Sequence, residues 1–149
     1  MNINCNGNLI DLSIPKVMGI LNVTPNSFYD GGKHREINSI IHQVDKMLSE
    51  GADFIDIGAY SSKPSAEFVT ETDEINRLVH VIKELVNTFP NIILSVDTFR
   101  AEVARVAVDN GVAIVNDIPA GVVDKTLLET VAALKVPSIM MHMRGNPQP

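Results

Sequence analysis

Cysteine is nearly absent from this chain, and long apolar or basic runs are absent altogether. The single cysteine, Cys5, cannot form an internal disulfide and cannot build a cysteine zinc site. No apolar run reaches the roughly 18 residues that a membrane helix needs. The net charge of −6 comes without a cluster of lysine or arginine, which argues against a surface for nucleic-acid phosphates. These absences predict a cytoplasmic protein with neither a nucleic-acid nor a membrane partner.

The rest of the sequence alternates between two kinds of segment. With 45% apolar residues the chain can bury a core, and no linker divides it, so we expect one domain over residues 1–149. The pair Asn6-Gly7 predicts a hairpin within residues 1–16. From Val17 onward, short β-branched runs alternate with amphipathic segments, which is typical of parallel strands joined by crossover helices. The expected strands cover residues 17–22, 53–58, 92–97, 113–117 and 138–143.

The amphipathic segments between these strands predict four helices. Their apolar residues recur at spacings of three and four, and capping or helix-ending residues stand at the ends of the segments. The expected helices run from about Ile37 to Gly51, from Thr70 or Thr72 to before Pro90, from a Thr98 cap to Gly111, and from an Asp124 cap to about Lys135.

Two α/β architectures accommodate these elements. A flavodoxin-like open parallel sheet would be complete at this length, whereas a (β/α)₈ TIM barrel usually needs about 250 residues. The chain ends soon after the fifth strand, with no helix to cover it, and a missing second half of a barrel explains this ending. The open sheet would instead be favoured if the first strand lay in the middle, with a neighbour on each side.

Each predicted strand carries a polar side chain at or near its carboxyl end. In both architectures these ends share one rim, where ligands bind, so we expect the side chains to converge on one site. A structural role is the alternative for several of them: Asp56 as a buried acid accepting hydrogen bonds, Asp97 as support for the next helix, and His142 as a packed histidine. The five residues are Asn22, Asp56, Asp97, Asn116 and His142.

The loops after the first two strands give a second signal. TPNSFYDGG and GAYSSKPSA are rich in Gly, Ser and Pro, as loops that close over a site often are, and each carries one charge, Asp30 and Lys63. Asn22 and Asp30 offer the oxygen ligands that Mg²⁺ prefers, with substrate phosphate completing its coordination. Lys63 could meet the same anion. The sequence contains no zinc motif, P-loop or dinucleotide fingerprint.

Five stretches, in order along the chain, match motifs of one family. They are VMGILNVTPNSFYDGG at 17–32, GADFIDIGAYSSKPSA at 51–66, ILSVDT at 93–98, VAIVNDI at 112–118 and MMHMRGNP at 140–147. In these motifs the chain resembles the N-terminal half of bacterial dihydropteroate synthase. The resemblance implies a (β/α)₈ barrel, of which about five strands and four helices are present here, truncated after the fifth strand.

The resemblance also implies an activity. The family condenses 6-hydroxymethyl-7,8-dihydropterin diphosphate with p-aminobenzoate, which gives 7,8-dihydropteroate and diphosphate in folate synthesis. Mg²⁺ is the implied cofactor, sulfonamides the implied inhibitors, and a homodimer the implied state of the full-length protein. The chemistry is a displacement at the pterin methylene that needs no nucleophilic side chain, because the weakly basic arylamine is already neutral at pH 7.

Site residues follow from the same resemblance. Asn22 would bind Mg²⁺ and diphosphate, with Asp30 supporting the metal. Asp97 and Asn116 would hydrogen-bond the pterin, and Met141 would line its pocket. Asn22, Asp97 and Asn116 are therefore expected to take part directly in catalysis.

The second loop adds further candidates. Ser62 would contact the diphosphate-bearing substrate and Lys63 its anion, which makes Lys63 a fourth catalytic candidate. Pro64 and Phe28 would frame the aminobenzoate ring. Asp56, which ends the second predicted strand, is also assigned to substrate binding.

The chain departs from the family pattern in places. Asn26 stands for the usual Asp, Ala59-Tyr60 for Gly-Glu, and residues 61–65 read SSKPS instead of STRPG, so Lys63 lacks the bidentate fork of arginine. The later DPGFGFGK, SRKS and Arg-x-His motifs have no counterpart, so we expect the isolated chain to be inactive. The alternatives are a methyl transferase acting on reduced folate and a non-catalytic pterin-binding module that pairs with another chain.

Overall fold

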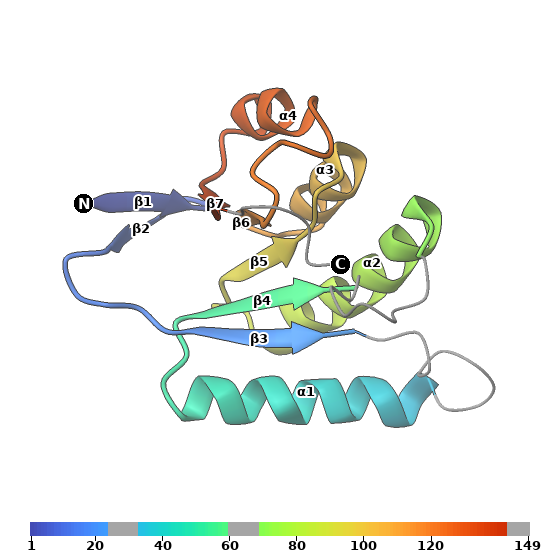
Figure 1. Ribbon diagram of the computed structural model, residues 1–149. Helices are drawn as coiled ribbons and strands as arrows, with labels where there is room; N and C mark the ends of the chain where they lie inside the picture. Colours follow the sequence, from blue (N-terminus) through green and yellow to red (C-terminus); the bar gives the residue numbers. More distant parts are fainter. Residues whose placement is uncertain (24–32, 60–68, 143–149) are drawn as a thin grey trace.

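The computed structural model describes residues 1–23, 33–59 and 69–142, and it confirms the predicted alternation of strands and helices (Figure 1). A short antiparallel hairpin comes first, followed by a five-stranded parallel sheet whose strands are connected through four helices. The elements are β1 (Asn2–Cys5), β2 (Asn8–Asp11), β3 (Met18–Asn22), α1 (Lys33–Ser49), β4 (Phe54–Gly58), α2 (Glu71–Thr88), β5 (Leu94–Asp97), α3 (Ala101–Asp109), β6 (Ile114–Asp117), α4 (Leu127–Leu134) and β7 (Ser138–Met140).

The strand order of the large sheet decides between the two predicted architectures. The order is β3-β4-β5-β6-β7, so strands that follow one another in sequence are neighbours in space. A doubly wound open sheet reverses its order and places its first strand inside, whereas a barrel adds strands in sequence. The flavodoxin-like alternative is therefore wrong, because β3 lies at an edge. Within the described residues β3 pairs only with β4, and β7 only with β6.

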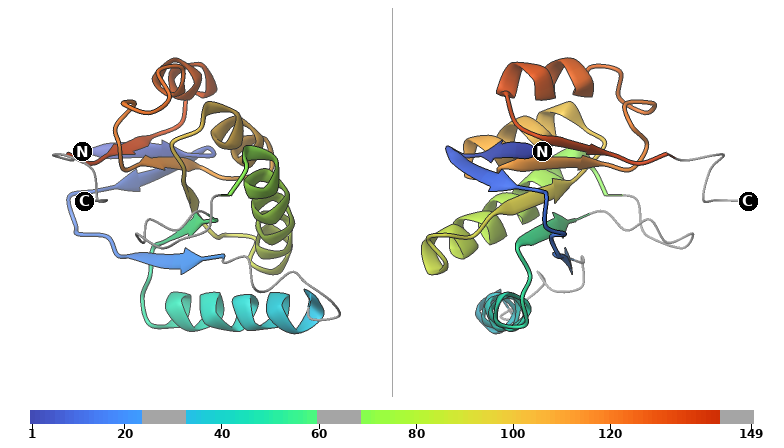
Figure 2. Two further views of the ribbon diagram at one scale, coloured as in Figure 1. Left: turned by 45° about the vertical axis from the view of Figure 1, so that its right-hand side comes forward. Right: turned by 90° about the vertical axis from the view of Figure 1, so that its left-hand side faces the viewer.

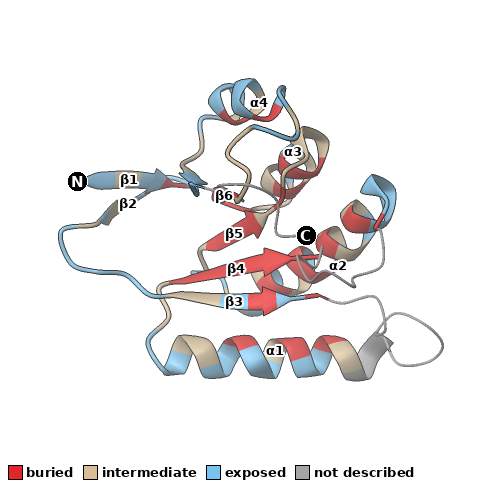
Figure 3. Cartoon of the chain, in the orientation of Figure 1, coloured by how far each residue is buried: buried red, intermediate tan, exposed pale blue. Residues whose placement is uncertain are grey.

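The helices cover one face of this sheet. In the two views of Figure 2 they form a layer around the curved sheet, and along it α1 packs on α2, α2 on α3, and α3 on α4. The central strands are buried along most of their length, as the red bands in Figure 3 show, and alternate side chains of each strand point into the helix layer. The strand side chains in this core include Leu21, Ile55, Ile57, Leu94, Val96 and Val115.

Helix ends were predicted with mixed success. The Thr70 cap is confirmed: its hydroxyl oxygen accepts a hydrogen bond from the amide of Asp73 at 3.1 Å. At the end of α1, Gly51 takes a φ of +106°, the left-handed conformation expected there.

The other two predicted caps are wrong. Helix α3 begins at Ala101 and α4 at Leu127, each about two residues later than expected. Thr98 does not cap α3: its hydroxyl donates to Glu74 and accepts from the amide of Arg100, the residue before the helix. Asp124 instead accepts hydrogen bonds from the amides of Ala101 and Thr126. Both side chains bond outside the helices that they were expected to start.

The N-terminal hairpin covers the amino ends of the strands, opposite the polar rim. Its turn has positive φ at Asn6 and Gly7, as the sequence predicts. Cys5 packs against Phe54 and Ile114, and the Asn6 amide donates to the carbonyl oxygen of Gly111 at 3.0 Å. Burial raises the pKa of the Cys5 thiol, which makes it a poor nucleophile. Of the described helices, none is both long and apolar enough to cross a membrane.

Candidate functional site

Three of the predicted polar residues lie in one row across the sheet. The strand register pairs Asn22 with Gly58, Gly58 with Asp97, and Asp97 with Asn116. Directly paired residues point to the same face of a sheet. The buried core residues of these strands face the helices, and the residues of the row alternate with them along each strand. The row therefore faces the opposite side of the sheet, at the carboxyl ends of the strands. The predicted convergence of Asn22, Asp97 and Asn116 is confirmed.

Gly58 leaves a space in the middle of this row. A Cβ atom at Gly58 would lie 3.6 Å from Oδ2 of Asp97 and 3.8 Å from Oδ1 of Asn22. The side chains of Asn22 and Asp97 therefore approach the same point from the two neighbouring strands. Any side chain at Gly58 would occupy the place where a ligand can meet both oxygens.

Asp56 lies one layer below the row, on the same face. It is 2% exposed, and its Oδ2 accepts a hydrogen bond of 2.9 Å from the side-chain amide of Asn116. This bond orients the amide, so that Oδ1 of Asn116 remains available as an acceptor. Oδ1 of Asp56 and Oδ1 of Asn116 are both buried and have no hydrogen-bond partner among the described residues. Buried acceptors of this kind are usually bonded, which indicates a place for ligand donors or water.

Ser95 belongs to the same layer, and the sequence analysis missed it. It is fully buried, it pairs with Asp56 in the strand register, and its hydroxyl has no partner within the described ranges. A signal was present: Ser95 precedes Asp97 by two residues in β5, so strand alternation places both on one face. It adds a donor to the floor of the site.

The site concentrates negative charge at Asp97. Burial, together with the nearby carboxyls of Asp56, Glu74 and Asp117, raises the pKa of its carboxyl from 3.8 to about 7. Near neutral pH this group is therefore present in both forms, and can donate or accept a hydrogen bond. Its location at a strand end, beside a gap, is typical of a functional carboxyl.

Asp117, the neighbour of Asn116, has a structural role. It is 1% exposed and points to the helix side, where its carboxylate accepts a hydrogen bond from the amide of Gly121. Burial raises its pKa, while the backbone donors around it oppose that shift. It closes the turn that follows β6, so only Asn116 of this pair faces the ligand side.

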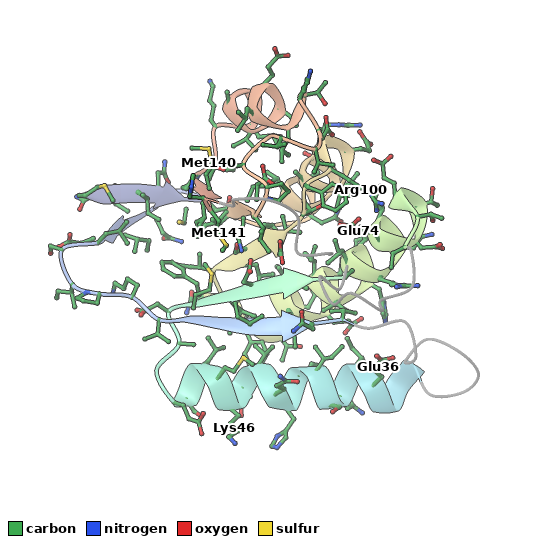
Figure 4. All side chains as sticks on the ribbon, viewed as in Figure 1. Glu36, Lys46, Glu74, Arg100, Met140 and Met141 are labelled. Atoms are coloured by element: carbon green, nitrogen blue, oxygen red, sulfur yellow. The ribbon has the colours of Figure 1, made fainter. Side chains whose placement is uncertain are left out.

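The last strand differs most from its prediction. β7 ends at Met140, three residues earlier than expected, so His142 lies beyond the strand and is exposed. The interpretation of His142 as a packed histidine is therefore wrong. Met141 is 49% exposed and follows β7, with its amide 3.4 Å from the carbonyl oxygen of Asp117 (Figure 4). Its role as a lining of the pterin pocket stays a prediction.

The loop candidates Phe28, Asp30, Ser62, Lys63 and Pro64 lie outside the described residues, and their roles also stay predictions.

Magnesium has limited but suitable ligands here. In the part of the chain that the structure describes, no three His, Cys, Asp or Glu residues are close enough to hold a metal. Mg²⁺ usually takes only one or two protein oxygens and keeps water or phosphate for the rest. The exposed Asn22 amide beside the Gly58 gap fits that requirement.

Comparison with known proteins adds the family. The family model described as "Pterin binding enzyme" matches residues 18–149. The chain is a member of the pterin binding enzyme family. The matched region begins at β3 and includes the whole row of Asn22, Gly58, Asp97 and Asn116.

Several relatives of this chain are named dihydropteroate synthase. That of Haemophilus influenzae is 42% identical over 148 residues, which are 99% of this chain and 53% of the relative. The Xanthomonas albilineans enzyme with 4-aminobenzoic acid is 41% identical with a TM-score of 0.84, covering 97% of this chain and 53% of that chain. In complex with 7,8-dihydropteroate, the same enzyme gives 40% identity and a TM-score of 0.79, with coverage of 97% and 52%.

The chain therefore spans about half the length of the dihydropteroate synthases that it matches. Those proteins form a TIM-barrel family, and the sequential five-stranded sheet of this chain has the arrangement of part of such a (β/α)₈ barrel. The predicted resemblance to the N-terminal half of the family is confirmed.

Proposed function

We propose that this chain provides the pterin-binding half of a dihydropteroate synthase. The observation that carries the proposal is the pair of buried acceptors beneath the rim, Oδ1 of Asp56 and Oδ1 of Asn116, which have no partner among the described residues, with Asp97 in the row beside them. They are matched to a flat ligand that brings several N–H donors. The family membership supports a pterin as that ligand.

A pterin ring satisfies the chemistry of these groups. Its amino-pyrimidine edge alternates N–H donors with oxygen and nitrogen acceptors. The carboxylate of Asp56 and the amide oxygen of Asn116 can accept from the donors, while Asp97 can donate or accept because its pKa is about 7. A binding site whose buried polar groups are all used by the ligand rejects analogues that lack those donors.

The diphosphate of the substrate would lie at Asn22. Its exposed amide stands beside the Gly58 gap, at the edge of the row, where an extended group leaves the pterin. Asn22, with Asp30, would hold Mg²⁺, which supplies positive charge against the leaving diphosphate when bound. Lys63 would add a second positive charge to the same anion.

The reaction requires positioning more than proton transfer. A bond forms between the amine nitrogen of p-aminobenzoate and the pterin methylene carbon, while the bond from that carbon to the diphosphate oxygen breaks. The electron pair leaves with diphosphate, and the nitrogen then loses a proton to water. The chain's own part is to hold the pterin at Asp56, Asp97 and Asn116, and to orient the aminobenzoate ring between Phe28 and Pro64.

The edges of the sheet bear on activity. β3 and β7 each pair on one side only within the described residues, so the rim is built from one half of a barrel. We expect the 149-residue chain to bind a pterin without turnover. Sulfonamide sensitivity, a homodimeric full-length form and a cytoplasmic location complete the proposal.

Calorimetry with 6-hydroxymethylpterin tests the binding. We expect measurable affinity for the wild-type chain and a loss of at least about tenfold for Asn116→Ala, since a buried acceptor and the Asp56 bond both disappear. Leu9→Ala, which shortens an exposed side chain of the N-terminal hairpin at the opposite end of the strands, is the control. Equal affinities for Asn116→Ala and the wild type would contradict the proposal.

A coupled assay tests turnover. It follows diphosphate release together with consumption of p-aminobenzoate. Rates near those of ordinary enzymes, about 1 per second or more, would show that the chain acts alone. They would contradict the expectation that the 149-residue chain is inactive. Pterin binding without turnover supports that expectation.

A further inference from the structure

Glu74 is a fully buried carboxylate outside the row of site residues. It lies in the first turn of α2, and both of its oxygens are engaged. Oε1 accepts a hydrogen bond of 2.8 Å from the hydroxyl of Thr98, and Oε2 accepts one from the guanidinium of Arg100. Figure 4 shows Glu74 and Arg100 side by side, where α2 faces the turn after β5. A charge this deeply buried is tolerated only with such partners.

Thr98 connects this ion pair to the rim. It follows Asp97 directly, and its amide donates to the carbonyl oxygen of Asn116 at 3.0 Å. Its hydroxyl, held by Glu74, also accepts from the amide of Arg100 at 3.2 Å. The side chain of Thr98 is therefore fixed from α2, while its backbone ties the end of β5 to the end of β6.

Arg100 extends the connection to a third segment. Its Nη2 donates to the carbonyl oxygen of Val69 at 2.9 Å, and its guanidinium lies 5.0 Å from the centre of the Phe99 ring. Val69 is 3% exposed and comes just before the Thr70 cap of α2. The planar fork of arginine makes two contacts in fixed directions, which lysine cannot reproduce.

We propose that Glu74 and Arg100 are positioning residues of the ligand site: through Thr98 they hold Asp97 and Asn116 at the spacing that the ligand needs, and they lock the start of α2 to that rim. This rests on the proposed function only for the identity of the ligand. A buried ion pair is a poor source of stability, because well-packed apolar residues often stabilise as much or more. A geometric role explains why two side chains of the turn after β5 bond to one buried carboxylate of α2.

Three substitutions separate positioning from stability. Thr98→Val removes only a hydroxyl, Arg100→Lys keeps the charge but loses the fork, and Glu74→Gln keeps the shape but loses the charge. The matched control is Glu102→Gln, which breaks the exposed Glu102–Arg105 pair on α3. Affinity for 6-hydroxymethylpterin is measured at a temperature where circular dichroism shows every variant fully folded. We expect about tenfold weaker binding for the first three variants and no change for the control. Folded variants that bind as tightly as the wild type would overturn the proposal.

A second measurement needs no ligand. The charges that act on Asp97 are those of Asp56 on β4, Glu74 on α2 and Asp117 on β6, and Arg100 pairs with Glu74. Glu74→Gln leaves Arg100 without its counter-charge, so the pKa of Asp97 should fall; Arg100→Gln leaves Glu74 uncompensated, so it should rise. Carboxyl-carbon NMR titrations measure both pKa shifts. If the charge variants do not fold, the binding measurement on Thr98→Val still tests the proposal.

The two measurements also separate this proposal from the proposed function. If the wild type binds no pterin, the proposed function fails, and the titration alone decides the link to Asp97: opposite shifts support it, and no shift overturns it. If the wild type binds pterin while neither the affinities nor the titrations change, only the positioning role is overturned.

Discussion

The two faces of the five-stranded sheet use the same strands in different ways. On the helix side, Leu21, Ile57 and Val96 are at most 1% exposed and pack in a continuous apolar core. On the other side, Asp56 and Asn116 keep buried oxygens without a partner among the described residues, and Ile20 on the edge strand is 53% exposed. The first face has its packing satisfied within the chain. The second carries polar and apolar groups that lack such contacts, as expected of a ligand-binding face without its ligand.

The largest expected difference between the two faces is the loss of stability when one isoleucine on each face is truncated. Ile57→Ala on the helix side should lower the free energy of unfolding by about 3 to 4 kcal/mol, because it leaves a cavity in a packed core. Ile20→Ala on the open side should cost under about 1 kcal/mol, since half of that side chain already meets solvent. Urea unfolding measures both. Equal losses would mean that the faces do not differ in packing.

The charge on the open face should make stability depend on pH. The pKa of Asp97 is raised from 3.8 to about 7 in the fold, so the unfolded chain releases this proton first as the pH rises. Its contribution to stability is therefore complete below about pH 4 and declines up to pH 7, by at most about 1.4 kcal/mol for each pH unit. Asp97→Asn should remove this decline. Urea midpoints from pH 4 to 8 provide the check, and parallel curves for the two proteins would contradict it.

Filling the gap at Gly58 should affect binding more than folding. In Gly58→Ala the new methyl group would make ordinary contact with Asp97 and stand beside Asn22, so the fold should change by under about 1 kcal/mol. Affinity for diphosphate in the presence of Mg²⁺ should fall about tenfold. Calorimetry measures it, with Leu9→Ala on the exposed N-terminal hairpin as the control. A variant that binds normally would show that the gap is not part of the site.

The smallest expected effect lies in the helix layer, at the cap of α2. The Thr70 hydroxyl accepts from the amide of Asp73 and donates to its carboxylate at 2.6 Å. Thr70→Ala should lower the free energy of unfolding by about 1 kcal/mol and leave pterin affinity unchanged. The expectation for Thr98→Val is the opposite, because that variant should weaken pterin binding. If both variants weakened binding alike, the site would extend into the helix layer itself.

Much of the candidate site could be predicted because its residues occupy strand ends. Asn22, Asp97 and Asn116 each stand at the polar end of an apolar run, and in parallel α/β sheets such ends meet at one rim. Thr98 and Asp124 were misjudged for a physical reason: a capping side chain next to an expected helix can bond elsewhere once tertiary contacts form. Glu74 and Arg100 gave no signal, since acidic and basic residues near helix starts are usually solvated.

The sequence by itself determined the alternation of strands and helices, the family motifs and the polar rim, because hydrophobic periodicity and turn chemistry are local properties. Only the tertiary structure decided the sequential strand order, the row that sets Gly58 between Asn22 and Asp97, and the burial of the Asp56 and Asn116 oxygens that have no partner in the described part of the chain. Register and burial depend on pairing between segments far apart in the chain. For the same reason, the buried contact of Glu74 with Arg100 became visible only in the fold.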